Sequence, residues 1–197
     1  MARMSAWLIG MALFFSILAS NGQSQEPRRL GLNTTLRTFG EDLKSAEELG
    51  VSVIRIPLQW QFVRIRPEEY DWSTIDRFVK AAQAKQIDVL FSIRTISKGE
   101  VRKHKPQKRG VVQVRPISPS SVNMEQWIHF VETLAKRYLG QGVHYEIENE
   151  VNTEAFWKGT LDEYLELLQA GYEVIKKADP QAKVLPSAMG CGITQNF

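Results

Sequence analysis

Hydrophobic and polar residues alternate with two different periods along the chain, and the period changes at regular intervals. Short runs rich in apolar and β-branched residues predict strands at 30–33, 51–57, 87–93, 143–148 and 182–188. Between them, apolar residues recur every three or four positions, which predicts helices over 41–49, from 73, over 123–138 and from 160 to the Asp179–Pro180 pair. Strands separated by helices indicate an α/β fold with a parallel sheet, and four such units plus a fifth strand fit a half barrel or a small open sheet.

Polar pairs spaced three residues apart mark three of the predicted helix starts. In such a pair the first side chain accepts a hydrogen bond from the free backbone N–H groups of the first turn. The pairs are Ser73 and Asp76, Asn123 and Gln126, and Thr160 and Glu163. We expect each to cap its helix.

The first residues have the pattern of a signal peptide. Arg3 precedes an apolar stretch from Ala6 to Ala19, and small or polar residues follow it up to Gly22. The stretch is shorter than the roughly 20 residues that a membrane-spanning helix needs. We therefore expect a signal peptide at 1–22, one domain at 23–197, export to the periplasm or the extracellular space, and no membrane association after cleavage.

The net charge of +3 is concentrated in one segment, 98–115. Its charged residues are Lys98, Glu100, Arg102, Lys103, Lys105, Lys108, Arg109 and Arg115. This segment is either a solvated loop or a region that attracts an acidic polysaccharide, and nothing predicts a nucleic-acid partner. Cys191 is the single cysteine, so no intrachain disulfide can form, and the sequence implies neither a metal nor an organic cofactor.

Three glutamates alternate in the fourth predicted strand, within the segment YEIENEVN at 145–152. A regular strand would place Glu146, Glu148 and Glu150 on one face. Three adjacent carboxylates repel one another unless a bulge spreads them, water solvates them or cations match them. The alternative is an acidic strand end that is simply exposed.

YEIENEVN resembles the strand-four signature of clan A glycoside hydrolases, the (β/α)8 barrels that include the cellulase-like family five. The resemblance implies that Glu150 is the general acid/base and that Asn149 binds the sugar 2-hydroxyl. Asn152 matches the last position of the motif and is a candidate for substrate binding. Glu148 stands where Trp is common and Val151 replaces Pro, and both changes leave the Asn-Glu pair intact.

The resemblance continues upstream and covers about 30–188. The segment from Leu49 to Ile93 is similar to the second βα unit and third strand of these enzymes. By that match Arg55 is the strand-two arginine that holds the nucleophile carboxylate. Trp60 and Trp157 follow strands two and four, so they are candidates for stacking on sugars, with core packing as the alternative.

A complete barrel takes about 250 residues, more than the 197 present here. In the family the nucleophile comes from strand seven, and no Asp or Glu follows Asp179. We therefore expect an incomplete TIM (β/α)8-type barrel, strands one to five, from a retaining glycoside hydrolase that acts on a β-linked polysaccharide or oligosaccharide in carbohydrate catabolism. This chain alone should be inactive and should self-associate through its open sheet edges. The alternative is a non-catalytic carbohydrate-binding protein or a half barrel that assembles with another chain.

Overall fold

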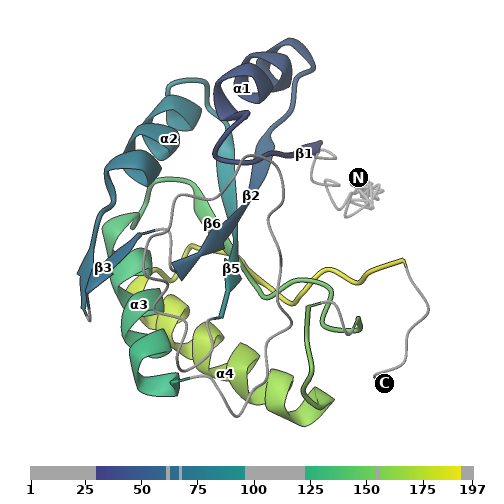
Figure 1. Ribbon diagram of the computed structural model, residues 1–197. Coiled ribbons are helices and arrows are strands. Elements are labelled where there is room, and N and C mark those ends of the chain that lie inside the picture. The colour runs from purple at the N-terminus through teal and green to yellow at the C-terminus, as the bar shows by residue number, and fades with distance from the viewer. Residues whose placement is uncertain (1–29, 61–62, 67, 96–122, 154–155, 192–197) are drawn as a thin grey trace, which may run out of the picture.

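A computed structural model describes residues 30–60, 63–66, 68–95, 123–153 and 156–191. Its centre is a parallel five-stranded sheet in the order β1 (Gly31–Asn33), β2 (Val53–Gln59), β5 (Asp88–Arg94), β6 (Val143–Ile147) and β7 (Val184–Leu185). The helices are α1 (Phe39–Glu48), α2 (Ser73–Gln83), α3 (Met124–Arg137) and α4 (Leu161–Ala178). The predicted alternation of strands and helices, with a parallel sheet, is confirmed (Figure 1).

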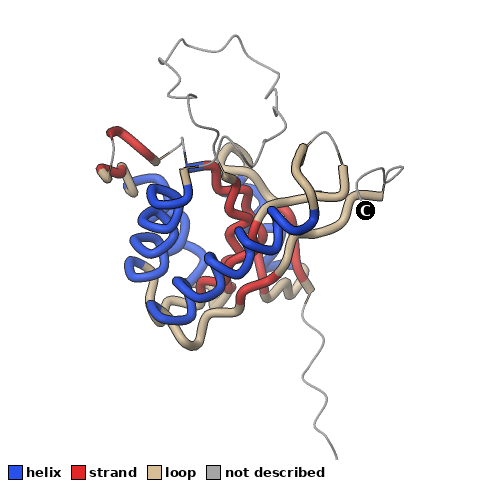
Figure 2. Tube along the Cα trace, turned by 90° about the horizontal axis from the view of Figure 1, so that it is seen from below, coloured by secondary structure: helices blue, strands red, loops and turns tan. Residues whose placement is uncertain are grey.

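The two faces of the sheet have different surroundings. Along β2, Ile54, Ile56 and Leu58 are fully buried, because the helices pack against their side of the sheet (Figure 2). The residues that alternate with them, Arg55 and Gln59 among them, lie on the opposite face and are only half buried. The polar side chains of β2, β5 and β6 therefore share one face, which the helices leave uncovered.

Close packing holds α4 against α3 and the sheet. A Cβ atom on Gly171 would lie 2.8 Å from Cη2 of Trp127 and 3.1 Å from Cδ1 of Ile147. Only a residue without a side chain fits there, so α4 can approach both neighbours closely. Among the described helices none combines the length and the apolar character needed to cross a bilayer.

β2 continues two residues beyond Pro57, where the sequence predicted its end. Thr34 N donates to Arg55 O at 2.9 Å, so Arg55 turns its backbone groups toward β1. The backbone groups of residues two apart in a strand point to the same side, so those of Pro57 also point toward the β1 side of β2. The pairing of β1 with β2 ends at Arg55, before it reaches Pro57. The missing N–H of Pro57 therefore removes no hydrogen bond of the sheet.

An antiparallel hairpin of β3 (Arg64–Arg66) and β4 (Glu69–Tyr70) precedes α2 and was not predicted. The predicted cap of α2 is also wrong: Trp72 occupies the N-cap position without a side-chain hydrogen bond, and Ser73 N donates instead to Asp71 Oδ1 at 2.9 Å. Asp76 bonds to Arg137 rather than to its own helix end.

The other two helix caps are confirmed. Asn123 accepts from Gln126 N, and Thr160 and Glu163 form a reciprocal capping box. The predicted signal peptide at 1–22 and the basic segment at 98–115 lie outside the described residues.

Candidate active site

The three glutamates of the YEIENEVN segment do not lie on a regular strand. β6 ends at Ile147, and both Glu148 (φ 66°) and Glu150 (φ 47°) have left-handed backbone conformations. Such conformations are uncommon for residues other than glycine and are concentrated at functional sites. The backbone changes direction at Glu148 and again at Glu150, so the three carboxylates have different surroundings.

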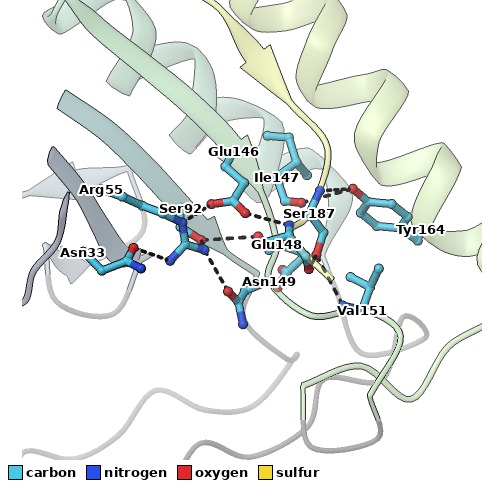
Figure 3. A network of polar contacts seen from close by, with 11 residues as sticks. Asn33, Arg55, Ser92, Glu146, Ile147, Glu148, Asn149, Val151, Tyr164 and Ser187 are labelled. Carbon is cyan, nitrogen blue, oxygen red and sulfur yellow. Dashed lines mark hydrogen bonds and ion pairs between the residues drawn. The ribbon is translucent and has the colours of Figure 1, made fainter. Parts of the chain in front are cut away.

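Glu146 is matched by a cation. Its Oε2 accepts from Arg55 Nε at 2.5 Å, its Oε1 accepts from Ala188 N at 2.7 Å, and the residue is 3% exposed (Figure 3). Arg55 and Glu146 belong to different strands. On β5, which lies between these strands, Arg55 faces Leu90 and Glu146 faces Ser92, two positions further along, so the ion pair is diagonal. The ion pair therefore connects β2 to β6 across the uncovered face of the sheet.

Arg55 also holds the amide of Asn149. One terminal nitrogen donates to Asn149 Oδ1 at 2.7 Å and to Ser92 Oγ at 3.0 Å, and the other donates to Asn33 Oδ1 at 3.4 Å (Figure 3). Because arginine is only a donor, the oxygen of the Asn149 amide must face it and the amide nitrogen must face away. The resemblance implies that Arg55 holds the carboxylate of the nucleophile, whereas in this structure Arg55 contacts Glu146 and Asn149.

Glu148 is buried and is bonded through one oxygen only. Its Oε1 accepts from Thr95 N at 2.5 Å and from Thr95 Oγ1, whereas its buried Oε2 has no hydrogen-bond partner. Burial raises the pKa of Glu148, and the bonds from Thr95 oppose this effect only in part. The structure thus favours the uncharged form of this carboxyl more than water does.

Glu150 differs from the other two because it is only partly buried. Its backbone N–H donates to Ala188 O at 2.7 Å, which fixes the residue against the segment after β7. Gly190 lies beside its carboxylate, and a Cβ atom there would be 3.1 Å from Oε2. Of the three glutamates, Glu150 is the one whose carboxylate remains open to a ligand.

Asn152 is 1% exposed, and both polar atoms of its side chain are engaged. Nδ2 donates to Gly190 O at 3.1 Å, and Oδ1 accepts from Gly190 N at 2.8 Å. It therefore holds the segment beside Glu150 rather than facing a substrate, contrary to the expected sugar contact.

Trp60 and Trp157 are 2% and 1% exposed. Trp60 stacks on Phe130 at 5.6 Å between ring centroids, and Trp157 meets Tyr164 edge-on at 6.2 Å. Both rings belong to the core, because neighbouring aromatic rings already cover them. The core-packing alternative holds for both, and neither ring is open to a sugar.

Arg94 is a site residue that the sequence analysis missed. It is the last residue of β5 and follows Ser92 by two positions, so it lies on the same face as Arg55 and Glu146. Its guanidinium carbon lies 4.7 Å from the centroid of the Phe156 ring. The available signal was that Ser92 and Arg94 are polar and alternate with the apolar Phe91 and Ile93 of the strand.

Within the described part of the chain, no group of three or more His, Cys, Asp and Glu residues is placed to hold a metal ion.

No protein-family model and no curated protein sequence matches the chain. Its structure is similar to that of a glycoside hydrolase, with a TM-score of 0.56, 17% identity, and coverage of 83% of this chain and 53% of that one. A family 39 glycoside hydrolase from Bacteroides cellulosilyticus WH2 is similar with a TM-score of 0.57 and 19% identity, and the match covers 81% of this chain and 32% of that one. The endoglucanase Cel5A of Pseudomonas stutzeri is similar with a TM-score of 0.52 and 18% identity, and the match covers 74% of this chain and 42% of that one. The chain thus spans about a third to a half of the length of these proteins. The described residues therefore have an α/β fold with a parallel sheet that is similar to part of the fold of these glycoside hydrolases.

Proposed function

We propose that the carboxyl ends of β2, β5 and β6 form the acid/base side of a retaining glycoside hydrolase site for a β-linked glycan. The observation that carries this proposal is the pair Asn149–Glu150. Glu150 is the partly exposed carboxyl of the three, and the adjacent Asn149 amide is oriented by Arg55. In barrels of this type, substrates bind at the carboxyl ends of the strands.

Each residue of the pair has a separate role in this proposal. Glu150 protonates the glycosidic oxygen as the leaving group departs, and it later removes a proton from the incoming water. Asn149 turns its amide nitrogen away from Arg55, so this nitrogen is available to donate to the sugar 2-hydroxyl. Arg55 is a positioning residue, because it acts through Asn149.

A retaining reaction also needs a nucleophilic carboxylate about 5–5.5 Å from the acid/base. Glu146 is committed to Arg55, and Glu148 is buried with a raised pKa. Neither is suited to attack an anomeric carbon, so the proposal places the nucleophile outside the described residues. This chain on its own is then expected to bind sugar without hydrolysing glycosides.

The proposal is tested with an α-glycosyl fluoride as donor and an aryl sugar as acceptor. The donor has the anomeric configuration of the missing glycosyl–enzyme intermediate. The acceptor oxygen bonds to the anomeric carbon, fluoride leaves with the electrons of the C–F bond, and Glu150 takes the acceptor proton. Wild type should transfer the sugar, and Glu150→Gln should lower the rate by about 10²-fold or more.

Glu166→Gln is the matched control, because Glu166 is an exposed glutamate on α4 and should leave transfer unchanged. Binding of the donor without transfer would favour the alternative, a non-catalytic carbohydrate-binding protein. Hydrolysis of an aryl β-glycoside by the purified chain, lost in Glu150→Gln, would contradict the expected inactivity and would mean that the chain supplies its own nucleophile.

A further inference from the structure

The guanidinium of Arg94 lies near the carboxylates of Glu146, Glu148 and Glu150 and is attracted by each. None of them forms a hydrogen bond or an ion pair with it among the described residues, and its buried Nε has no hydrogen-bond partner. Arginine carries five donors, and buried donors are nearly always satisfied in folded proteins. A buried Nε without a partner, on a guanidinium that is in no ion pair among the described residues, points to a ligand as the missing partner.

The neighbouring acids attract this charge but do not pair with it directly. Glu146 is committed to Arg55, and Glu148 bonds to Thr95 while its burial favours the uncharged form. Burial likewise lowers the pKa of Arg94, and the attraction of Glu148 offsets only part of that effect. Burial therefore removes water from the guanidinium, and no carboxylate among the described residues replaces that water as a hydrogen-bond partner of Nε.

Arg94 lies at the end of β5 on the same face as Arg55 and Glu146, near enough to Glu150 to be attracted by it. Its register partner is Gln59 of β2, and the ring of Phe156 covers one face of the guanidinium at 4.7 Å. Glu146, Glu148 and Glu150 all act on its charge, so it belongs to the same cluster as the proposed acid/base. An acidic group on a sugar bound beside Glu150 would therefore be attracted by the charge of Arg94.

We propose that Arg94 binds the carboxylate of an acidic sugar, so that this site takes a glycan that contains uronic acid. The inference rests on the proposed function and names its substrate class. A guanidinium matches a planar carboxylate with two parallel hydrogen bonds, whereas a neutral hydroxymethyl group would leave its donors unsatisfied. Stacking on Phe156 leaves the edge of the guanidinium free for this contact.

The test compares two tetrasaccharides that differ only at C6. Cellotetraose and β-1,4-linked tetraglucuronate are titrated calorimetrically into the purified chain at low salt. Wild type should bind the glucuronate about 10- to 100-fold more tightly, as expected for one charge-assisted contact. Arg94→Gln should remove this preference and keep the affinity for cellotetraose, and Arg94→Lys should keep part of the preference.

Arg64→Gln is the matched control. Its guanidinium lies over the ring of Trp60 at the same 4.7 Å, but it belongs to the β3–β4 hairpin. It should leave both affinities unchanged. If Arg94→Gln fails to fold, the sugar preference of Arg94→Lys tests the role of Arg94 instead. The Nε–H NMR signal of wild-type Arg94 provides a second test, because it should shift with the glucuronate and not with cellotetraose.

Four results would overturn the inference. Equal binding of both sugars, or a preference that survives in Arg94→Gln, would contradict the role of Arg94 while leaving the proposed function in place. Tighter binding of 6-sulfated cellotetraose than of the glucuronate would show that the anion is a sulfate ester rather than a carboxylate. Binding of none of these sugars would contradict the proposed function and this inference together.

Discussion

Replacing Arg55 with methionine should lower the free energy of unfolding by about 3 kcal/mol, because it leaves the Glu146 carboxylate buried without its cation. The side chains of the pair are 20% and 4% exposed, and Nε and Oε2 are 2.5 Å apart. Breaking a buried ion pair by removing one partner costs about 3–5 kcal/mol. We expect the lower end, because Glu146 keeps the hydrogen bond from Ala188 N and Arg55 is partly solvated.

Replacing both partners should cost less than the two single substitutions add up to. In Arg55→Met/Glu146→Met neither charge is left unpaired, and a pair of methionines can pack in place of the ion pair. The double-mutant cycle should therefore give a coupling energy of at least about 1 kcal/mol. Urea denaturation at pH 7, followed by far-UV circular dichroism, measures all four free energies.

The control is an ion pair on the surface. Lys44 and Glu48 of α1 are 3.9 Å apart with side chains 78% and 66% exposed. Lys44→Met should change the free energy of unfolding by less than about 0.5 kcal/mol. A loss below about 1 kcal/mol for Arg55→Met, or strict additivity in the cycle, would refute the reasoning that Glu146 depends on Arg55.

Three further substitutions test other parts of the structure. Burial raises the pKa of Glu148 above 4.5, so the free energy of unfolding of wild type should fall by about 1.4 kcal/mol per unit of that shift as pH rises from 4.5 through the folded pKa. Urea titrations should show that Glu148→Gln removes this fall. Parallel pH profiles of the two proteins would contradict the prediction. Gly171→Ala should lower Tm, because overpacking against Trp127 costs about 1–3 kcal/mol and the gain in helix propensity is at most about 1 kcal/mol; a higher Tm would show that α4 can shift. The hydrogen bonds from Arg137 lower the pKa of Asp76, so Asp76→Asn should lower the free energy of unfolding by about 0.5–1 kcal/mol at pH 7 and by less as pH falls below 3.8. A loss that does not depend on pH would mean that the charge of Asp76 is not involved.

Local signals in the sequence predicted the local parts of the fold. The order of strands and helices and two of the three caps follow from patterns within a few residues, and the structure confirms them. The cap at Ser73 failed because Asp71, two residues earlier, accepts its N–H. The β3–β4 hairpin is too short to produce a clear alternating pattern.

The contacts of the site depend on register, which no local pattern contains. Arg55 meets Glu146 because β2 and β6 both pair with β5 in a register that leaves the two side chains only two positions apart along the strands, although they are 91 positions apart in the chain. The sequence identified Asn149 and Glu150 through a resemblance, but it could not reveal that Arg55 orients Asn149. Trp60 and Trp157 were ambiguous for the same reason, because only the packing of distant rings decides whether an indole is buried.

The central claim is that the carboxyl ends of β2, β5 and β6 bind sugar around Glu150. The most direct measurement is an NMR titration of the ¹⁵N-labelled chain with cellotetraose and with tetraglucuronate. The account predicts that the amide signals of Ser92, Asn149 and Glu150 shift with a common dissociation constant, and that these shifts are lost in Asn149→Ala. Shifts confined to the groove between α2 and α3, which Asp76, Lys80, Gln83, Thr133, Lys136, Arg137, Tyr138 and Gln141 line, or no shifts at all, would contradict it.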